Sequence, residues 1–156
     1  MYKKINKIIE NFEIELSEDL TYYQIKNIKK GQNIMTNMLK VFDKLCRENN
    51  IKYWCTSGTL LGVIRHKGWI PYDGDIDVCM LEDDYNKFKK LKLPNDLFLQ
   101  NFETDSLYKK HGHQFLAKIR HKYSCYTTTR HNKFHHGLQL DIFIMKQEDK
   151  KLITLE

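Results

Sequence analysis

The residues best suited to chemistry are three aspartates, Asp73, Asp75 and Asp77, which occupy alternate positions near the middle of the chain. Apolar residues alternate with them from Ile76 onward, and this period-two pattern predicts a β-strand. Successive strand side chains point to opposite faces, so Asp75 and Asp77 should share one face. Adjacent carboxylates repel unless a cation neutralises them, and Mg²⁺ and Mn²⁺ prefer oxygen ligands. The pattern therefore predicts a metal site.

A second feature suited to chemistry precedes the aspartates. Ser57, Gly58 and Thr59 lie between a short apolar stretch, 51–55, and a segment with helical spacing, 59–65. A small-residue turn between a strand and a helix leaves backbone N–H groups free at the helix N-terminus, where they can bind an anion. The order of strand, turn, helix and aspartate strand predicts a phosphate-binding turn beside the metal site.

A single acid interrupts an apolar stretch near the end of the chain. Residues 138–145 alternate, with Leu140 and Ile142 on one side and Asp141 on the other. An unpaired carboxylate in a buried strand is costly, so Asp141 should be paired with a cation or bind a metal. A salt-bridged or edge-strand acid outside any functional site is the alternative.

Several helices and strands must position these residues. The expected helices cover 32–49, 59–65 and 82–91, and the expected strands cover 51–55, 73–80, 97–102, 114–120, 123–129 and 138–145. The first helix has an apolar stripe of Ile34, Met38, Val41, Phe42 and Leu45, and we expect it to serve for packing only. Ser17 is the expected N-cap of an earlier helix, which Gly31 should separate from the next one.

The run from Ser57 to Val78 resembles the signature of the LicD/fukutin family of phosphotransferases, in the polymerase-β-like nucleotidyltransferase superfamily. That signature is G-T-L-L-G, an arginine, a proline, an aromatic residue and D-x-D-h-D. The chain matches it at Gly58, Thr59, Leu60, Leu61, Gly62, Arg65, Pro71, Tyr72, Asp73, Asp75 and Asp77. It departs at Gly74, where the family often has another acid. A hairpin turn at Asp73-Gly74 with a solvated aspartate face is the alternative interpretation.

A comparable G-x-x-h-D-I-F run of the family is matched by Gly137, Asp141, Ile142 and Phe143. The resemblance implies an α+β nucleotidyltransferase-like fold, with helices packed on a mixed β-sheet. It also implies the metal-dependent transfer of a phospho-alcohol group, such as phosphocholine or a polyol phosphate, from a CDP-activated donor to a glycan or glycoconjugate acceptor. Asp141 would then be the third catalytic carboxylate and could take the acceptor's proton.

The predicted site follows from these residues. The catalytic residues and ligands of Mg²⁺ (or Mn²⁺) are Asp75, Asp77 and Asp141, and the nucleotide- and phosphate-binding residues are Ser57, Gly58, Thr59, Arg65, Lys118 and Arg120. Lys118 and Arg120 share one face of a predicted strand, so a solvated basic face is the alternative for them. Arg65 belongs to the signature and could instead fix the aspartate loop through a buried ion pair.

Other functions remain open. A nucleotidyltransferase that adds a nucleotide to RNA, protein or a small molecule would use the same residues, and binding of NTP rather than a CDP-alcohol would identify it. An inactive nucleotide-binding relative is a second alternative, against which the intact aspartates argue. The net charge of +6 favours a phosphate-bearing partner. A basic nucleic-acid binder is a third alternative, which predicts salt-dependent affinity that survives loss of the acids, and nucleic acid is not the partner that we expect.

The chain has 156 residues with 41% hydrophobic and 29% charged residues, as in soluble globular domains. We expect an N-terminal helical extension, 1–30, and a catalytic domain, 31–156. No signal peptide or transmembrane-length apolar stretch is evident, and the four cysteines form no C-x-x-C pair, so a cytoplasmic location is expected. The residues His111, His113, Cys125, His131, His135 and His136 fit no standard zinc spacing, and a polar loop is favoured over structural zinc.

Overall fold

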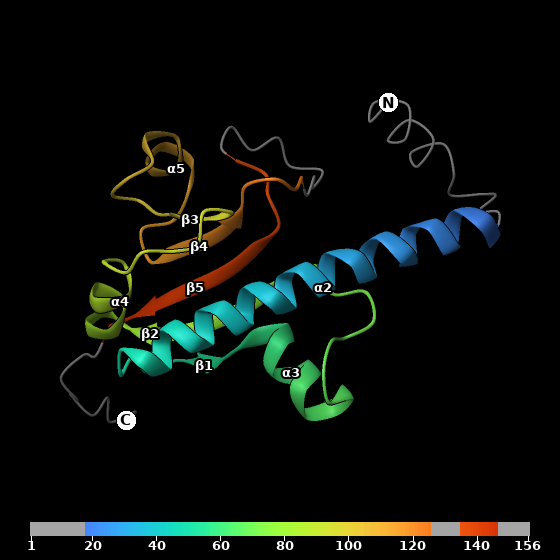
Figure 1. The fold of residues 1–156 in the computed structure, drawn as a ribbon, viewed down its shortest axis with the longest axis horizontal. Coiled ribbons are helices and arrows are strands. Elements are labelled where there is room, and N and C mark those ends of the chain that lie inside the picture. The colour runs from blue at the N-terminus through green and yellow to red at the C-terminus, as the bar shows by residue number, and fades with distance from the viewer. Residues whose placement is uncertain (1–17, 126–134, 147–156) are drawn as a thin grey trace, which may run out of the picture.

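The computed structural model describes residues 18–125 and 135–146, with side-chain surroundings omitted for 18–26 and His111. The elements are α2 (Glu18–Glu48), β1 (Trp54–Cys55), α3 (Ser57–His66), β2 (Ile76–Leu81), α4 (Glu82–Phe88), β3 (Leu97–Gln100), α5 (Ser106–His111), β4 (Leu116–His121) and β5 (Gln139–Met145). Figure 1 shows the long helix α2 running diagonally across the sheet.

The strands form one five-stranded mixed sheet in the order β1-β2-β5-β4-β3. Neighbours β2 and β5 are parallel, and the other three pairs are antiparallel. The α+β fold with helices packed on a mixed sheet, which the sequence predicts, is therefore confirmed. The parallel pair is essential for the site, because it brings residues 76–81 and 139–145 side by side although they are far apart in the sequence.

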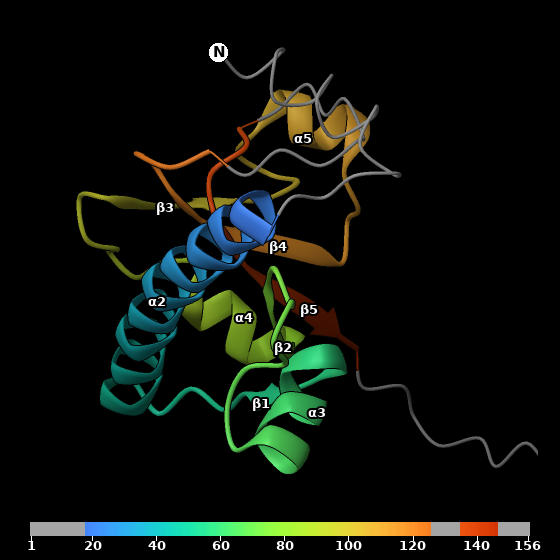
Figure 2. The same cartoon turned by 90° about the vertical axis from the view of Figure 1, so that its right-hand side faces the viewer.

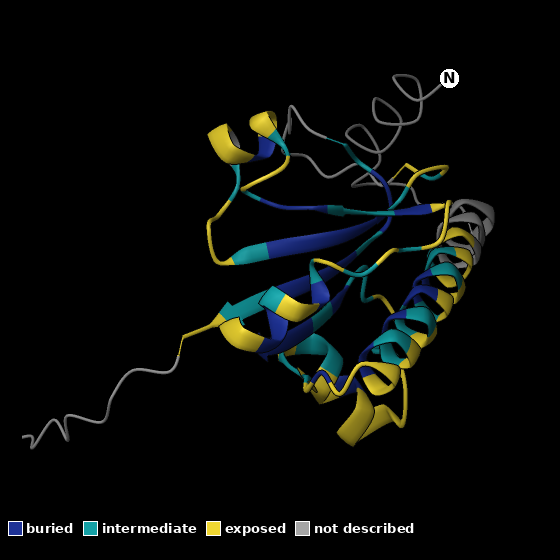
Figure 3. Cartoon of the chain, turned by 60° about the vertical axis from the view of Figure 1, so that its left-hand side comes forward, coloured by how far each residue is buried: buried dark blue, intermediate teal, exposed yellow. Residues whose placement is uncertain are grey.

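One face of the sheet and the helices α2 and α4 form the hydrophobic core. Alternate residues of the central strands, among them Val78 and Ile142, are fully buried, and Figure 3 shows these strands buried along most of their length. Helix α4 lies beside α2 (Figure 2), where the rings of Phe42 and Phe88 are 5.0 Å apart between centroids. Because strand side chains alternate, Asp77 and Asp141 must point to the opposite face.

The helix break expected at Gly31 is absent, because α2 continues through it from Glu18 to Glu48. Glycine in a helix interior costs about 1 kcal/mol, which the burial of apolar residues later in α2 offsets. The buried stripe also differs from the expected one: its members are Met35, Met38, Phe42 and Cys46, while Ile34, Val41 and Leu45 are partly buried beside it. The expected cap at Ser17 lies outside the described residues, and the division between 1–30 and 31–156 stays a prediction.

Other boundaries differ locally from the expected ones. The first strand is limited to Trp54–Cys55, and β2 begins only at Ile76, so Asp73 and Asp75 precede it. A turn ends at Asp73, whose N–H donates to the carbonyl of Ile70 at 3.1 Å. Helix α5 was not expected from the sequence. The expected strand over 123–129 is wrong for 123–125, which form a turn and coil, and its remainder lies outside the described residues.

Helix α3 packs on the protein through glycine and exposes its larger apolar residues. Gly62 is its buried residue, whereas Leu60, Leu61, Val63 and Ile64 are all at least two-fifths exposed. The chain after α3 folds back over Gly62, where Lys67 is left-handed and the Gly68 N–H donates to the Gly62 carbonyl at 3.3 Å. Across the described residues, no helix combines the length and apolar character needed to cross a membrane.

Candidate active site

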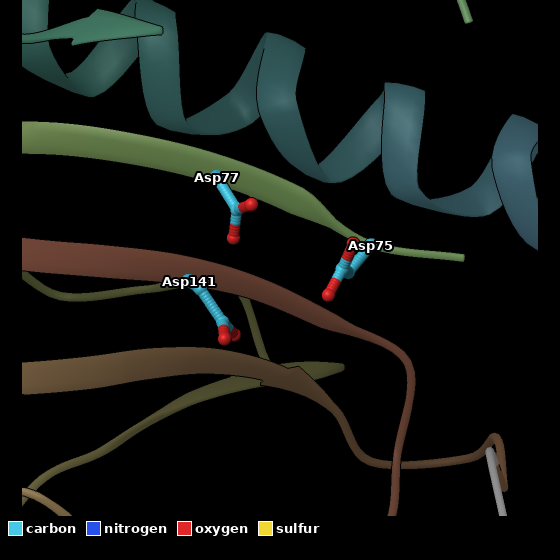
Figure 4. Close-up of side chains that lie close together, drawn as sticks. All are labelled: Asp75, Asp77 and Asp141. Atoms are coloured by element: carbon cyan, nitrogen blue, oxygen red, sulfur yellow. The ribbon is translucent and has the colours of Figure 1, made fainter. Parts of the chain in front are cut away.

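Three carboxylates meet on the polar face of the sheet. The register of the parallel pair places Asp77 of β2 directly beside Asp141 of β5. Asp75 precedes Asp77 by two residues, so its side chain lies on the same face. One oxygen from each carboxylate lies within 4.8 Å of the others, and Figure 4 shows the three side chains entering one space. Within the described residues, this is the group of His, Cys, Asp or Glu side chains that could hold a metal.

The three carboxylates repel one another in a partly buried place. Burial, followed by the charges of Asp75 and Asp141, raises the pKa of Asp77 to about 6. Burial, then the charges of Asp141 and Asp73, also raises the pKa of Asp75. Burial raises the pKa of Asp141 in turn, although Lys118 opposes that effect. A bound cation would favour the ionised form of these carboxylates and relieve the repulsion that acts on Asp75 and Asp77.

The two oxygens of Asp141 have different surroundings. Its Oδ2 accepts a hydrogen bond from the ammonium group of Lys118, and the Gln139 amide nitrogen lies 3.4 Å from the same oxygen. Its Oδ1 is buried and has no hydrogen-bond partner in the structure. An unsatisfied buried acceptor costs about 1–3 kcal/mol, so this oxygen is suited to a ligand. The all-oxygen set of three carboxylates fits Mg²⁺ or Mn²⁺.

The start of α3 fixes the backbone of Asp77. The Asp77 N–H donates to Thr59 Oγ1 at 2.8 Å, and the Thr56 N–H donates to the Asp77 carbonyl at 3.1 Å. Thr59 thus acts on the site by holding β2, a contact that the sequence did not reveal. Its predicted contact with phosphate stays a prediction.

The small-residue turn forms the first turn of α3 rather than a loop before it. Ser57 is exposed and left-handed, with a φ of 49°. Gly58 lies against Asp73, since a Cβ at Gly58 would be 2.7 Å from Asp73 Oδ2. The N-cap residue Thr56 makes no side-chain hydrogen bond to this turn, so that side chain does not occupy the turn's backbone N–H groups. The turn therefore retains the features of an anion site beside the carboxylates.

Helix α2 does more than pack, contrary to the expectation from its apolar stripe. Gln32 is 7% exposed, and its amide nitrogen donates to the carbonyl of Asp73 at 3.0 Å and to that of Ile70 at 3.3 Å. The indole N–H of Trp69 donates to Thr36 Oγ1 at 2.9 Å. These contacts hold the loop before Asp75. A glutamine one helical turn before Met35, on the buried stripe, is the sequence signal that could have indicated this role.

The three predicted basic residues lie in different surroundings. Lys118 is paired with Asp141, as described above. Arg120 is 3% exposed, and its guanidinium donates to Gln100 Oε1 at 3.0 Å and to the Gly137 carbonyl at 2.8 Å. Arg65 is exposed on the last turn of α3, so the alternative of a buried ion pair is wrong for it. Phosphate binding by these three residues stays a prediction.

A pocket of about 190 Å³ lies between α2, α3 and the loop 68–73, and Asp75, Asp77 and Asp141 are not among its lining residues. Its walls are mostly apolar or small, with Gly58, Trp69 and Ile70 among them and Asp73 as the acid. The histidine-rich segment is only partly described, and His131 lies outside the described residues. His135 has a local role there, because its Nδ1 accepts from the Gly137 N–H at 2.9 Å.

The raised pKa of Asp77 predicts how the stability of the metal-free protein depends on pH. The pKa is about 6 when folded against an ordinary value of 3.8, so the folded state binds this proton more tightly. The resulting stabilisation is present below about pH 4 and is lost as the pH rises through about 6. We expect the melting temperature to fall by several degrees between about pH 5 and about pH 7.5.

Two comparisons check this assignment. Saturating Mg²⁺ should remove most of the fall, because the cation favours the ionised carboxylates. The Asp77→Asn variant should show a smaller fall than the wild type. An equal fall in the two proteins would place the titrating group elsewhere.

The chain is similar to a known protein family and to several known proteins. The family model described as LicD/FKTN/FKRP, nucleotidyltransferase domain, matches residues 50–155. The chain is 46% identical over 61 residues to the lipopolysaccharide cholinephosphotransferase LicD of Haemophilus influenzae, covering 39% of this chain and 23% of the relative. An uncharacterized protein of Rickettsia typhi is 44% identical over 54 residues, covering 35% and 18%. One of Rickettsia prowazekii is 42% identical over 67 residues, covering 43% and 24%. The matches thus span about a quarter or less of these curated relatives.

Proposed function

Because the chain belongs to the LicD/FKTN/FKRP family, we propose that it is a metal-dependent phosphotransferase. It moves a phospho-alcohol group, such as phosphocholine or a polyol phosphate, from a CDP-activated donor to a glycan-type acceptor. The name of the Haemophilus influenzae relative supports phosphocholine as the group and a lipopolysaccharide-type glycan as the acceptor. The four free cysteines support a cytoplasmic location.

The observation that carries this proposal is the carboxylate cluster with the unsatisfied Asp141 Oδ1. Asp75, Asp77 and Asp141 would hold Mg²⁺ or Mn²⁺. When bound, such an ion neutralises charge on the donor's phosphate oxygens and aligns the reacting groups. The cluster lies beside the first turn of α3, whose backbone N–H groups would bind the remaining phosphate oxygens.

The transfer exchanges one phosphorus–oxygen bond for another. A hydroxyl oxygen of the acceptor forms a bond to the phosphorus of the phospho-alcohol group, and the bond from that phosphorus to the bridging oxygen breaks. CMP leaves with the bridging oxygen and its electron pair. The proton of the acceptor hydroxyl passes to a carboxylate of the cluster, for which Asp141 is the proposed acceptor.

The pocket beside Asp73 suits the alcohol part of the donor. Its apolar walls, one indole and one carboxylate are the groups that bind a quaternary ammonium such as that of choline. The neighbouring N–H groups of α3 would then bind the adjoining phosphate. This arrangement favours CDP-choline over CDP-glycerol, whose alcohol carries no positive charge.

A melting-temperature series tests the proposal. CDP-choline, CDP-ribitol, CDP-glycerol, ATP and GTP are each added with and without Mg²⁺, because a ligand that binds only the folded state raises the melting temperature. We expect the CDP-alcohols with Mg²⁺ to give the largest shifts, with CDP-choline first among them. Equal shifts for all bases would favour a general nucleotidyltransferase. No metal-dependent shift with any nucleotide would favour an inactive relative.

A further inference from the structure

A row of polar side chains crosses the sheet at the level of the carboxylates. The registers of successive strand pairs place Gln100 of β3 beside Lys118 of β4, Lys118 beside Asp141 of β5, and Asp141 beside Asp77 of β2. Residues paired in this way lie on the same face of a sheet, so Lys118 enters the cluster from the strand next to Asp141. Its side chain is 11% exposed, and that of Asp141 is 8% exposed.

Lys118 is in direct contact with a carboxylate of the cluster. Its ammonium group bonds Asp141 Oδ2, and its charge also acts on Asp75 and Asp77. The other cation that acts on Asp141 is Arg120, which hydrogen-bonds to Gln100, Gly137 and Gln139. With all three carboxylates ionised, Lys118 reduces the charge of the cluster from −3 to −2, which one divalent cation neutralises.

We propose that Lys118 is a resident counter-cation that weakens the binding of the divalent cation at this site. In the metal-free protein it partly neutralises the three carboxylates and allows the site to remain folded. In the metal-bound protein it repels the second cation, so that tight binding requires the phosphate oxygens of the donor. This inference rests on the proposed function, because it assigns a regulator to the same metal site.

The sign of the effect follows from the charges. Charges interact more strongly in a partly buried site than in water. Removal of the Lys118 charge beside three carboxylates should therefore strengthen the binding of a divalent cation. Loss of a hydrogen bond that orients Asp141 acts in the opposite direction. The hydrogen bond acts on Asp141 alone, whereas the charge of Lys118 acts on Asp75, Asp77 and Asp141, so we expect the charge effect to dominate.

Binding of Mn²⁺ without nucleotide, measured by titration calorimetry, tests the inference. Lys118→Met should bind Mn²⁺ at least about tenfold more tightly than the wild type, while its metal-free melting temperature falls. Excess Mn²⁺ should restore the melting temperature of this variant. Lys118→Gln, which keeps a hydrogen-bond donor but loses the charge, should also bind Mn²⁺ more tightly and provides the test if Lys118→Met does not fold.

Two matched variants separate the charge from other effects. Lys118→Arg keeps the charge and should bind Mn²⁺ as the wild type does. Lys90→Met removes an exposed lysine just beyond α4 and should change neither quantity. Unchanged or weaker Mn²⁺ binding in both Lys118→Met and Lys118→Gln would overturn the role of Lys118 while leaving the metal site in place. No Mn²⁺ binding to any of the proteins, the wild type included, would overturn the proposed metal site together with it.

Discussion

Asp75→Asn and Asp77→Asn should each weaken the binding of Mg²⁺ or Mn²⁺ by about 100-fold or more. Each change removes a charged oxygen ligand from the cluster, and even partners outside the ligand set are worth about 10–100-fold in metal sites. The metal-free variants should melt at a higher temperature than the wild type, because an amide does not repel the neighbouring carboxylates. Calorimetry with Mn²⁺ and thermal melting measure the two effects.

The opposite signs of these effects distinguish a functional cluster from a structural one. Residues that are kept for chemistry often cost stability, so loss of binding with a gain in stability is the expected combination. Asp83→Asn is a suitable control, since Asp83 is an exposed acid in the first turn of α4. Wild-type Mn²⁺ affinity in both Asp75→Asn and Asp77→Asn would show that the two carboxylates are not ligands.

Gly62→Ala should produce a large loss of stability. A Cβ at this position would lie 2.5 Å from the carbonyl oxygen of Gly68 and 3.2 Å from the Ile70 nitrogen, both of which are backbone atoms. The loop after α3 would have to move, and overpacking of this kind costs about 1–3 kcal/mol. Thermal melting should show a decrease of roughly 2–12 °C for a domain of this size.

The chain offers a matched control for this change six residues later. A Cβ at Gly68 would meet no atom within 4 Å, and no glycine of the described residues has a positive φ. Gly68→Ala should therefore be close to neutral. If the two variants melted alike, the close contact between Gly62 and the returning loop would not exist in solution.

The strand patterns allowed much of the site to be predicted. Alternation placed Asp75 and Asp77 on one face, and the lone acid Asp141 in an apolar strand indicated a second source of carboxylate. The structure adds that β2 and β5 pair in parallel, and this pairing sets Asp77 directly beside Asp141. The family resemblance, also stated from the sequence, is confirmed by the match over residues 50–155.

What the sequence did not reveal depends on contacts between distant residues. The hydrogen bonds from Gln32 to the loop before Asp75 span 38 and 41 residues, and the bond between Lys118 and Asp141 spans 23. Local patterns cannot show such pairs. Continuity of α2 through Gly31 reflects tertiary packing that overrides the low helix propensity of glycine. The sequence also did not reveal that the apolar side chains of α3 point outward. That orientation depends on the following loop, whose backbone occupies the space beside Gly62.

Titration of CDP-choline into the wild-type protein, with and without Mg²⁺, tests the central claim most directly. If the carboxylate cluster binds a cation whose shell the donor phosphates complete, Mg²⁺ should tighten CDP-choline binding by roughly tenfold or more. CDP-choline should then tighten Mg²⁺ binding by the same factor, because coupling between two ligands is reciprocal. Equal CDP-choline affinity with and without Mg²⁺, or no binding under either condition, would contradict the account.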